Sequence, residues 1–289
     1  MSLLGPTGAA EVALFAVIFL MGAAIGSFLN VVIFRLPRRE SLVYPRSRCL
    51  SCGEELGVID LVPVLSYLGL RGRCRHCRRS YSPRYMLVEA FTGLAAVGAL
   101  QLFGPTLKAP LLFIVFCCLV VVFFIDLDHY IIPDETVAII AAVGIVLDLA
   151  TLLSGGTGSA LVFNERLSVG TGYEVLLPKS LVGMAMGAGL FVVIAFVSER
   201  VFKRPGMGWG DVKLAGAMGA ILGPGYQFFT FFIISVIVGA VVGVICMAFG
   251  RCGRRDYIPF GPMLAVAAVL VLYFGSAVTP VVMSRFVIQ

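Results

Sequence analysis

Long apolar runs separated by short polar stretches dominate the chain, and they predict transmembrane helices. A helix needs about 20 mostly apolar residues to cross a bilayer. Eight runs meet or approach this requirement, near residues 11–34, 86–104, 109–126, 135–153, 179–198, 212–224, 226–248 and 259–283. The sixth run is shorter than the others and rich in glycine. The pattern therefore predicts an all-α polytopic membrane protein with about eight transmembrane helices.

The composition excludes an ordinary soluble domain. Of the 289 residues, 60% are hydrophobic and 13% are charged, and the mean hydropathy is +1.01. Soluble proteins carry about 25% charged residues, so the charged fraction here is roughly half the usual one. The polar residues that remain are concentrated in a few segments, and these segments indicate the organisation of the chain.

One polar segment divides the chain into three expected parts. Residues 1–34 form the first transmembrane helix, residues 35–85 form a polar insert, and residues 86–289 form the transmembrane core. Half of the 22 lysines and arginines lie in the insert, and all of those are arginine. Because cytoplasmic loops carry an excess of basic residues, the insert is expected in the cytoplasm and the N-terminus outside. No basic residue precedes Arg35, so a cleaved signal peptide is not expected.

Alternating the eight spans keeps the other basic loops in the cytoplasm and places the C-terminus outside. Residues 154–178 then become an outside loop. The net charge of +6 could indicate nucleic acid, but the insert has few aromatic residues on which bases could stack, and no nucleic-acid partner is expected. The arginines of the insert have two remaining interpretations, as determinants of orientation or as contacts with anionic lipid headgroups.

Four cysteines in the insert have the spacing of a metal site. They form two Cys-x2-Cys pairs, Cys49/Cys52 and Cys74/Cys77, separated by 21 residues. Four thiolates can surround a zinc ion tetrahedrally, whereas two disulfides would be disfavoured in the reducing cytoplasm. Four cysteine ligands leave no open position for a catalytic water, so the expected zinc is structural. The insert is therefore predicted to be a small zinc ribbon.

An aspartate preceded by alternating glycines is the strongest candidate for chemistry. Gly206, Gly208 and Gly210 lead to Asp211 and then to the short sixth span. Glycine allows close approach of another backbone, so the run is expected to be a flexible loop. A carboxylate near membrane depth costs about 2.5–3.5 kcal/mol and usually has a partner and a function. An alternative role for Asp211 is to cap the sixth span.

The expected partner of Asp211 lies at the cytoplasmic end of the third span. Asp126 continues that span and has no local capping role, Asp128 suits a solvated acid, and Asp134 suits the N-cap of the fourth span. His129 suits an interfacial side chain. Two close carboxylates share a proton, so one can activate water while the other protonates a scissile carbonyl. Asp126 and Asp211 are therefore the predicted catalytic pair of an aspartyl peptidase.

Further residues are candidates for binding substrate. Gly208 and Gly210 could lie along an extended substrate backbone, and Lys213 could attract an acidic substrate residue or simply orient the chain. Glu89 lies just inside the second span and is either a boundary residue or part of a site.

Sequence blocks along nearly the whole chain resemble the type IV prepilin peptidases. The blocks are GSFLNVVIFRLP from Gly26, the two Cys-x2-Cys pairs with PVLSYLGLRGRC from Pro63, Arg84-Tyr85-x3-Glu89, Asp126-x5-Ile132-Pro133-Asp134, GMGxGDVKL from Gly206 and IPFGP from Ile258. The resemblance implies a GxGD-type intramembrane aspartyl protease whose catalytic pair is Asp126 and Asp211. The stretch between these aspartates is longer than usual in this family, and Trp209 occupies the variable position of the glycine motif.

The resemblance also implies substrate, location and a second activity. The substrate would be a prepilin or pseudopilin of a bacterial type IV pilus or type II secretion system, cut after a glycine at the cytoplasmic face of the inner membrane. The family then methylates the new N-terminus with S-adenosylmethionine, an activity associated with the cysteine insert. The sequence itself contains no glycine-rich nucleotide loop on a strand–helix unit, so residues that bind the methyl donor are not assigned.

Two other function classes fit parts of the pattern. A proton-coupled transporter could use Asp126 and Asp211 as relay carboxylates, but it would be expected to carry acids at several membrane depths. A non-catalytic zinc-containing scaffold would leave both aspartates without a role in processing. Substitution of either aspartate distinguishes these alternatives from the peptidase.

Overall fold

The computed structural model describes residues 8–153, 167–169, 173–175, 178–203, 207–250 and 258–286. The chain divides into two units, Met1–Val121 and Val122–Gln289, and each is described by itself. Gly206 of the predicted glycine loop and most of the predicted outside loop 154–178 lie outside the described residues.

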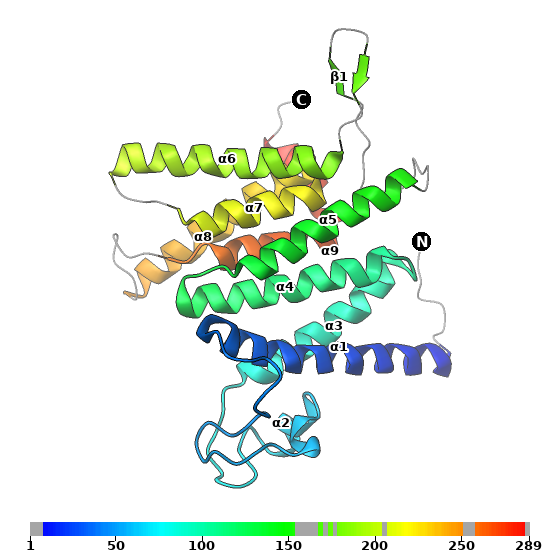
Figure 1. Ribbon diagram of the computed structural model, residues 1–289, viewed down its shortest axis with the longest axis vertical. Coiled ribbons are helices and arrows are strands. Elements are labelled where there is room, and N and C mark those ends of the chain that lie inside the picture. The colour runs from blue at the N-terminus through cyan, green and yellow to red at the C-terminus, as the bar shows by residue number, and fades with distance from the viewer. Residues whose placement is uncertain are drawn as a thin grey trace. The chain divides into compact units, whose positions relative to one another are not determined.

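The first unit consists of long helices and the insert between two of them. Its elements are α1 (Ala9–Arg35), the 3-10 turns η1 (Leu36–Arg38) and η2 (Val58–Leu61), α2 (Leu65–Gly69), α3 (Arg84–Phe103) and the first part of α4 (Lys108–His129). Helices α1 and α3 pack closely along glycines. A Cβ at Gly26 would lie 2.8 Å from Cα of Glu89, and one at Gly22 would lie 2.7 Å from Cβ of Ala96. The insert follows the C-terminal end of α1 and leads into the N-terminal end of α3 (Figure 1).

The second unit surrounds a short central helix. After the last turns of α4 come α5 (Asp134–Leu153), a small antiparallel hairpin of β1 (Leu167–Val169) and β2 (Tyr173–Val175), α6 (Lys179–Phe202), α7 (Trp209–Leu222), α8 (Tyr226–Ala248) and α9 (Gly261–Phe286). In Figure 1, α7 runs between α6 and α5.

Small residues allow the neighbours of α7 to approach it closely. A Cβ at Gly183 of α6 would collide with the backbone of Gly219, and one at Gly144 of α5 would lie 2.8 Å from Ala220. Asp211 and the run from Leu214 to Ala220 are buried. Protein therefore covers α7 on most of its surface, and its first turn is held in a fixed place.

Seven helices of the described residues are long and apolar enough to cross a membrane: α1, α3, α4, α5, α6, α8 and α9. This confirms the prediction of a polytopic all-α membrane protein. Helix α7 occupies the place of the predicted sixth span but has 14 residues, which gives a length of about 21 Å. The hydrocarbon core of a bilayer is about 30 Å thick, so α7 does not cross it by itself. The glycine-rich composition that shortens α7 also allows its close packing.

Candidate active site

Asp126 lies in the last turn of α4 and points to the start of another helix. Its side chain is buried, and its Oδ2 accepts a hydrogen bond of 2.9 Å from the backbone N–H of Gly261, the first residue of α9. The positive end of a helix favours a negative charge, so α9 stabilises the carboxylate form. A Cβ at Gly261 would lie 2.6 Å from the same Oδ2. Glycine is therefore required at position 261 for this contact.

Asp211 lies in the first turn of α7 and, like Asp126, bonds to a backbone N–H at the start of a helix. Its side chain is buried, and its Oδ2 accepts a hydrogen bond of 3.2 Å from the backbone N–H of Gly208. The N–H of Asp211 in turn donates to the carbonyl of Gly208 at 3.1 Å. The capping role considered for this residue is therefore real. It holds the carboxyl group in one orientation at the positive end of α7.

The two carboxyl groups are close enough for their charges to interact. They come from residues 85 positions apart in the sequence and are brought together inside the second unit. Two buried carboxyl groups whose charges interact hold one proton between them more easily than two full charges. One ionised and one protonated carboxyl group is the arrangement that general acid–base hydrolysis requires.

The four predicted metal ligands also come together, within the insert. The sulfur atoms of Cys49, Cys52, Cys74 and Cys77 all lie within 4.8 Å of one another, and those of Cys49 and Cys77 are 3.9 Å apart. Thiolates bound tetrahedrally at about 2.3 Å from zinc are about 3.8 Å apart. The sulfur positions therefore fit a four-coordinate metal ion.

The two cysteine pairs lie in equivalent backbone turns. In the first turn, the N–H of Cys49 donates to the carbonyl of Glu54, and the N–H of Gly53 donates to the carbonyl of Cys49. In the second turn, the N–H of Cys74 donates to the carbonyl of Arg79, and the N–H of Arg78 donates to the carbonyl of Cys74. Gly53 and Arg78 are equivalent and have positive φ values of 76° and 59°. N–H groups of Cys52 and Ser51 near the Cys49 sulfur lower the pKa of that thiol to about 6, which favours the thiolate that binds metal.

Comparisons with known proteins identify both parts of the chain. The profile of the Bacterial Peptidase A24 N-terminal domain matches residues 20–103, and that of the Type IV leader peptidase family matches residues 113–244. A relative from Aeromonas hydrophila, named prepilin leader peptidase/N-methyltransferase, is 34% identical over 94% of this chain and 94% of its own length. The chain belongs to the Type IV leader peptidase family.

Relatives with the same name occur in other bacteria. The one from Burkholderia pseudomallei is 33% identical over 89% of this chain and 84% of its own length, and the one from Pseudomonas aeruginosa is 30% identical over 90% of each. No solved structure matches the chain. As a member of the Type IV leader peptidase family, the protein is an enzyme and a multi-pass membrane protein.

Within this leader peptidase, the glycine motif is more helical than predicted. Helix α7 begins at Trp209, so Gly210 lies in its first turn, and Gly208 has an extended backbone with φ −77°. Neither residue has a positive φ. Gly210 instead permits close contact, since a Cβ there would lie 3.0 Å from Cβ of Ile132. The flexible loop expected through Gly210 is therefore wrong at that residue, because contact with Ile132 fixes the backbone.

The predicted cap and the predicted substrate lysine are found together. Asp134 is the first residue of α5, one position inside the helix that it was expected to cap. Its Oδ1 accepts a bond of 2.8 Å from Nζ of Lys213, and both side chains are exposed. Lys213 therefore already has an acidic partner in this protein, whereas its contact with substrate stays a prediction.

Glu89 connects the first unit's membrane helix to the insert. Its Oε2 accepts a bond of 2.8 Å from the backbone N–H of Val64, and the hydroxyl of Ser27 on α1 also bonds to its side chain. Val64 has a φ of 62°, an unfavourable value for a β-branched residue. The geometry gives Glu89 a positioning role in the insert, and its contact with substrate stays a prediction.

Sequence reasoning missed one buried acid, Asp148, inside the span of α5. Its Oδ2 accepts two hydrogen bonds from Ser180, one of 2.9 Å from the backbone N–H and one of 2.7 Å from the hydroxyl. Ser180 is the second residue of α6, so Asp148 caps α6 from a neighbouring helix. The signal was present in the sequence, because an acid within an apolar run nearly always has a partner.

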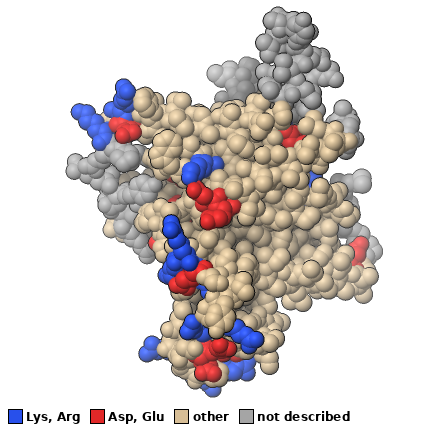
Figure 2. Space-filling model, viewed as in Figure 1, with Lys and Arg blue, Asp and Glu red and all other residues tan. Residues whose placement is uncertain are grey.

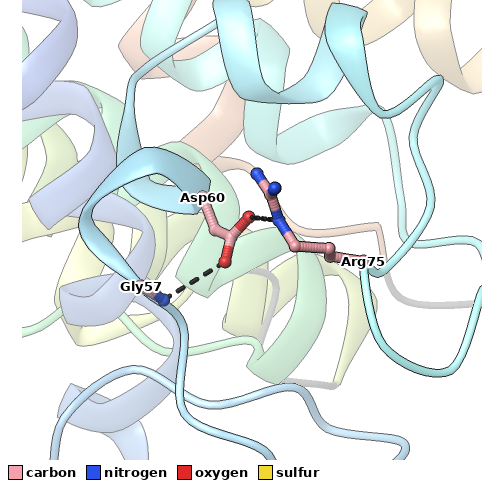
Figure 3. A network of polar contacts seen from close by, with 3 residues as sticks. All are labelled: Gly57, Asp60 and Arg75. Carbon is pink, nitrogen blue, oxygen red and sulfur yellow. Dashed lines mark hydrogen bonds and ion pairs between the residues drawn. The ribbon is translucent and has the colours of Figure 1, made fainter.

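Another acid, Asp60, orders the insert near the second cysteine pair. Figure 3 shows its carboxylate between the N–H of Gly57, at 3.2 Å, and Nε of Arg75, at 2.7 Å. The hydrogen bond from Arg75 lowers the pKa of the Asp60 carboxyl group. Because Arg75 follows Cys74 directly, this contact fixes the turn that carries the second pair of sulfur atoms.

Proposed function

We propose that Asp126 and Asp211 are the catalytic pair that removes the basic leader of a type IV prepilin or pseudopilin. The observation that carries the proposal is the meeting of two buried carboxyl groups, each bonded to an N–H at the start of a helix. Relatives named prepilin leader peptidase/N-methyltransferase support the substrate class. The enzyme acts after a glycine, at the cytoplasmic face of the bacterial inner membrane.

The proposed cleavage uses one ionised and one protonated carboxyl group. The ionised group removes a proton from a water molecule while the protonated group donates to the scissile carbonyl oxygen, and a C–O bond forms. Collapse of the tetrahedral intermediate breaks the C–N bond, and the leaving amine takes a proton. The peptide must be extended at this point, because the amide of a helical residue is hydrogen-bonded and shielded. Gly208 is the proposed backbone contact beside Asp211.

We extend the proposal to N-methylation of the new N-terminus, on the strength of the relatives' names. S-Adenosylmethionine would be the methyl donor, with the methyl group passing to the freed amine as the amine loses a proton. The described residues contain no strand–loop–helix unit of the usual nucleotide-binding kind. No residue of the chain is therefore assigned to this donor.

The four cysteines are the proposed ligands of a structural zinc ion. Bound zinc would hold the two turns of the insert together and take no part in hydrolysis, because four sulfur ligands complete its coordination. Metal analysis of the purified Cys49→Ser and Cys74→Ser variants tests this. We expect loss of zinc from both variants, and full zinc content in either would remove that residue from the ligand set.

Cleavage of a synthetic prepilin peptide by purified enzyme tests the catalytic pair. Asp126→Asn and Asp211→Asn should each reduce the rate by about 10²–10⁴-fold, the usual contribution of a general acid or base. Asp128→Asn is the matched control, since this acid is exposed on the same turn of α4, and it should cleave at the normal rate.

Two other results would change the assignment. Full cleavage by either Asp126→Asn or Asp211→Asn would show that the pair is not catalytic. Full cleavage by Asp126→Asn together with loss of cleavage in Asp134→Asn would move the first catalytic role to Asp134. Circular dichroism of each variant should match that of the natural protein, so that loss of rate is not loss of folding.

A further inference from the structure

The insert carries an exposed apolar face that its zinc site does not explain. The face is formed by side chains of η2 and α2, two elements that lie next to each other. Their exposed fractions range from 41% to 86%, for Val58, Ile59, Leu61, Leu65 and Leu68. Contiguous apolar surface of this kind marks an interaction site, because leaving it in water is unfavourable.

Contacts with α3 determine the level at which this face lies. The N–H of Val64, directly before α2, bonds to Glu89, which is five residues inside the candidate span that begins at Arg84. Five helical residues cover about 7.5 Å, and glutamate side chains lean toward the start of their helix. The start of α2 therefore lies beside the first turn and a half of α3, at the end of the candidate span where the hydrocarbon core meets the headgroups.

A row of aromatic rings also holds α2 beside the start of α3. Tyr67 of α2 packs edge-on against Tyr81, with ring centroids 5.1 Å apart, and Tyr81 packs against Tyr85 of α3 at 6.2 Å. Leu65 and Leu68 are three residues apart and share a side of α2, and Leu65 is about 200° around the helix from Tyr67. Leu65 therefore faces away from Tyr67 and α3, and Leu68, about 100° from Tyr67, lies to the side of this direction; both side chains are exposed.

The charge around this face selects among partners. Between Arg35 and Arg84 the insert has 11 arginines against four acids, Glu40, Glu54, Glu55 and Asp60, so its net charge is 11 − 4 = +7. In Figure 2 several blue side chains, with red ones among them, lie over the part that Figure 1 draws as the insert. Anionic lipids attract such a basic segment, and apolar side chains beside it enter the boundary between headgroups and acyl chains.

We propose that the face formed by Val58, Ile59, Leu61, Leu65 and Leu68 docks on the anionic surface of the membrane that α1 and α3 cross. The arginines contact the headgroups, and the five apolar side chains enter the headgroup layer. Docking holds the insert at a fixed height over the bilayer. It adds to the contacts that Val64 and Tyr81 make with α3. This surface is independent of the proposed catalytic pair, and its test does not depend on cleavage.

Fluorescence quenching by brominated lipids tests the proposal. The chain has one tryptophan, so Trp209→Phe gives a dark background into which Leu65→Trp or, separately, Leu68→Trp is introduced. The full-length variants are placed in vesicles of phosphatidylcholine and phosphatidylglycerol whose acyl chains carry bromine near the headgroup. We expect fluorescence to fall by about twofold or more at either position. Leu50→Trp, exposed on the first cysteine turn, is the control and should keep its intensity.

Three results would overturn the proposal. Fluorescence at positions 65 and 68 that is insensitive to brominated lipid but quenched by aqueous iodide would show that the face is in water or reserved for a soluble partner. Equal quenching at position 50 would show that this face is not the one that docks. Equal quenching in vesicles of phosphatidylcholine alone would remove the role of anionic lipid. Two separate tryptophan positions allow the test to proceed if one variant fails to fold.

Discussion

Two regions of the second unit bury a carboxyl group against the start of a helix, and they differ in what else is near. Asp126 accepts one N–H from α9 and lies close to a second acid, Asp211. Asp148 accepts both an N–H and a hydroxyl from Ser180. Neutral donors satisfy Asp148 and give it a structural role. Asp126 has an acidic neighbour instead, and in the proposed mechanism the two acids share a proton that can be transferred to substrate.

The largest effect is expected from a substitution next to Asp126 that keeps both Asp126 and Asp211. In Gly261→Ala the added methyl group would overlap Oδ2 of Asp126, so the carboxyl group must shift from its present position. A misplacement of about 1 Å can cost about 10²-fold in rate. We therefore expect kcat for a prepilin peptide to fall by that order.

Gly189→Ala is the matched control for this prediction. A Cβ at Gly189, in α6, meets nothing within 4 Å, so kcat should be unchanged. Normal kcat in Gly261→Ala would show that the contact between Asp126 and α9 does not position the catalytic group.

An intermediate effect, on stability and not on rate, is expected at Asp148. In Asp148→Asn a neutral amide oxygen replaces the charged acceptor of the two bonds from Ser180, and hydrogen bonds to charged groups are worth about 1.5–3 kcal/mol each against about 0.5–1.5 kcal/mol for neutral ones. Thermal unfolding in detergent should show a lower midpoint, while cleavage per folded molecule stays normal. Ser180→Ala removes only the hydroxyl donor and should lower the midpoint less.

The same variant tests the relay alternative. A proton-coupled transporter would use Asp148 as a third buried acid, inside the span of α5. Loss of cleavage in Asp148→Asn at normal stability would show that Asp148 takes part in catalysis. Its role would then not be purely structural, and the distinction from Asp126 would be wrong.

The smallest effect is expected at the exposed ion pair of Lys213 and Asp134. Pairs exposed to solvent contribute about 0–1 kcal/mol, so Lys213→Met and Asp134→Asn should each change the free energy of unfolding by less than that, with kcat unchanged. Steady-state kinetics distinguish the two side chains. A rise in KM confined to Lys213→Met would establish that the lysine attracts an acidic residue of the substrate.

Much of the fold follows from the sequence because each long helix has its own apolar run. The ends of some helices also follow from the sequence. The predicted range 226–248 coincides with α8, and the predicted range 135–153 differs from α5 by one residue at its start. Asp126 and Asp211 are candidates for a similar reason, since acids at the ends of apolar runs are few and conspicuous.

Contacts between distant residues could not be predicted in this way. The bond from Gly261 to Asp126 joins positions 135 residues apart, and a glycine before Pro262 carries no signal of its partner. The helical start at Trp209 depends on the packing of Gly210 against Ile132, and glycine alternation by itself favours a loop. The role of Glu89 required the structure for the same reason, because its partner is a backbone N–H.

The shortness of α7 has a consequence for how the enzyme responds to its membrane. Helices that meet lipid along their length tilt or deform the bilayer when their apolar length and its thickness differ. Helix α7 is about 21 Å long and is covered by protein over most of its surface, so it avoids this hydrophobic mismatch. Changes in acyl-chain length therefore act on the longer helices of the described chain, and the helix that carries Asp211 is insulated from them.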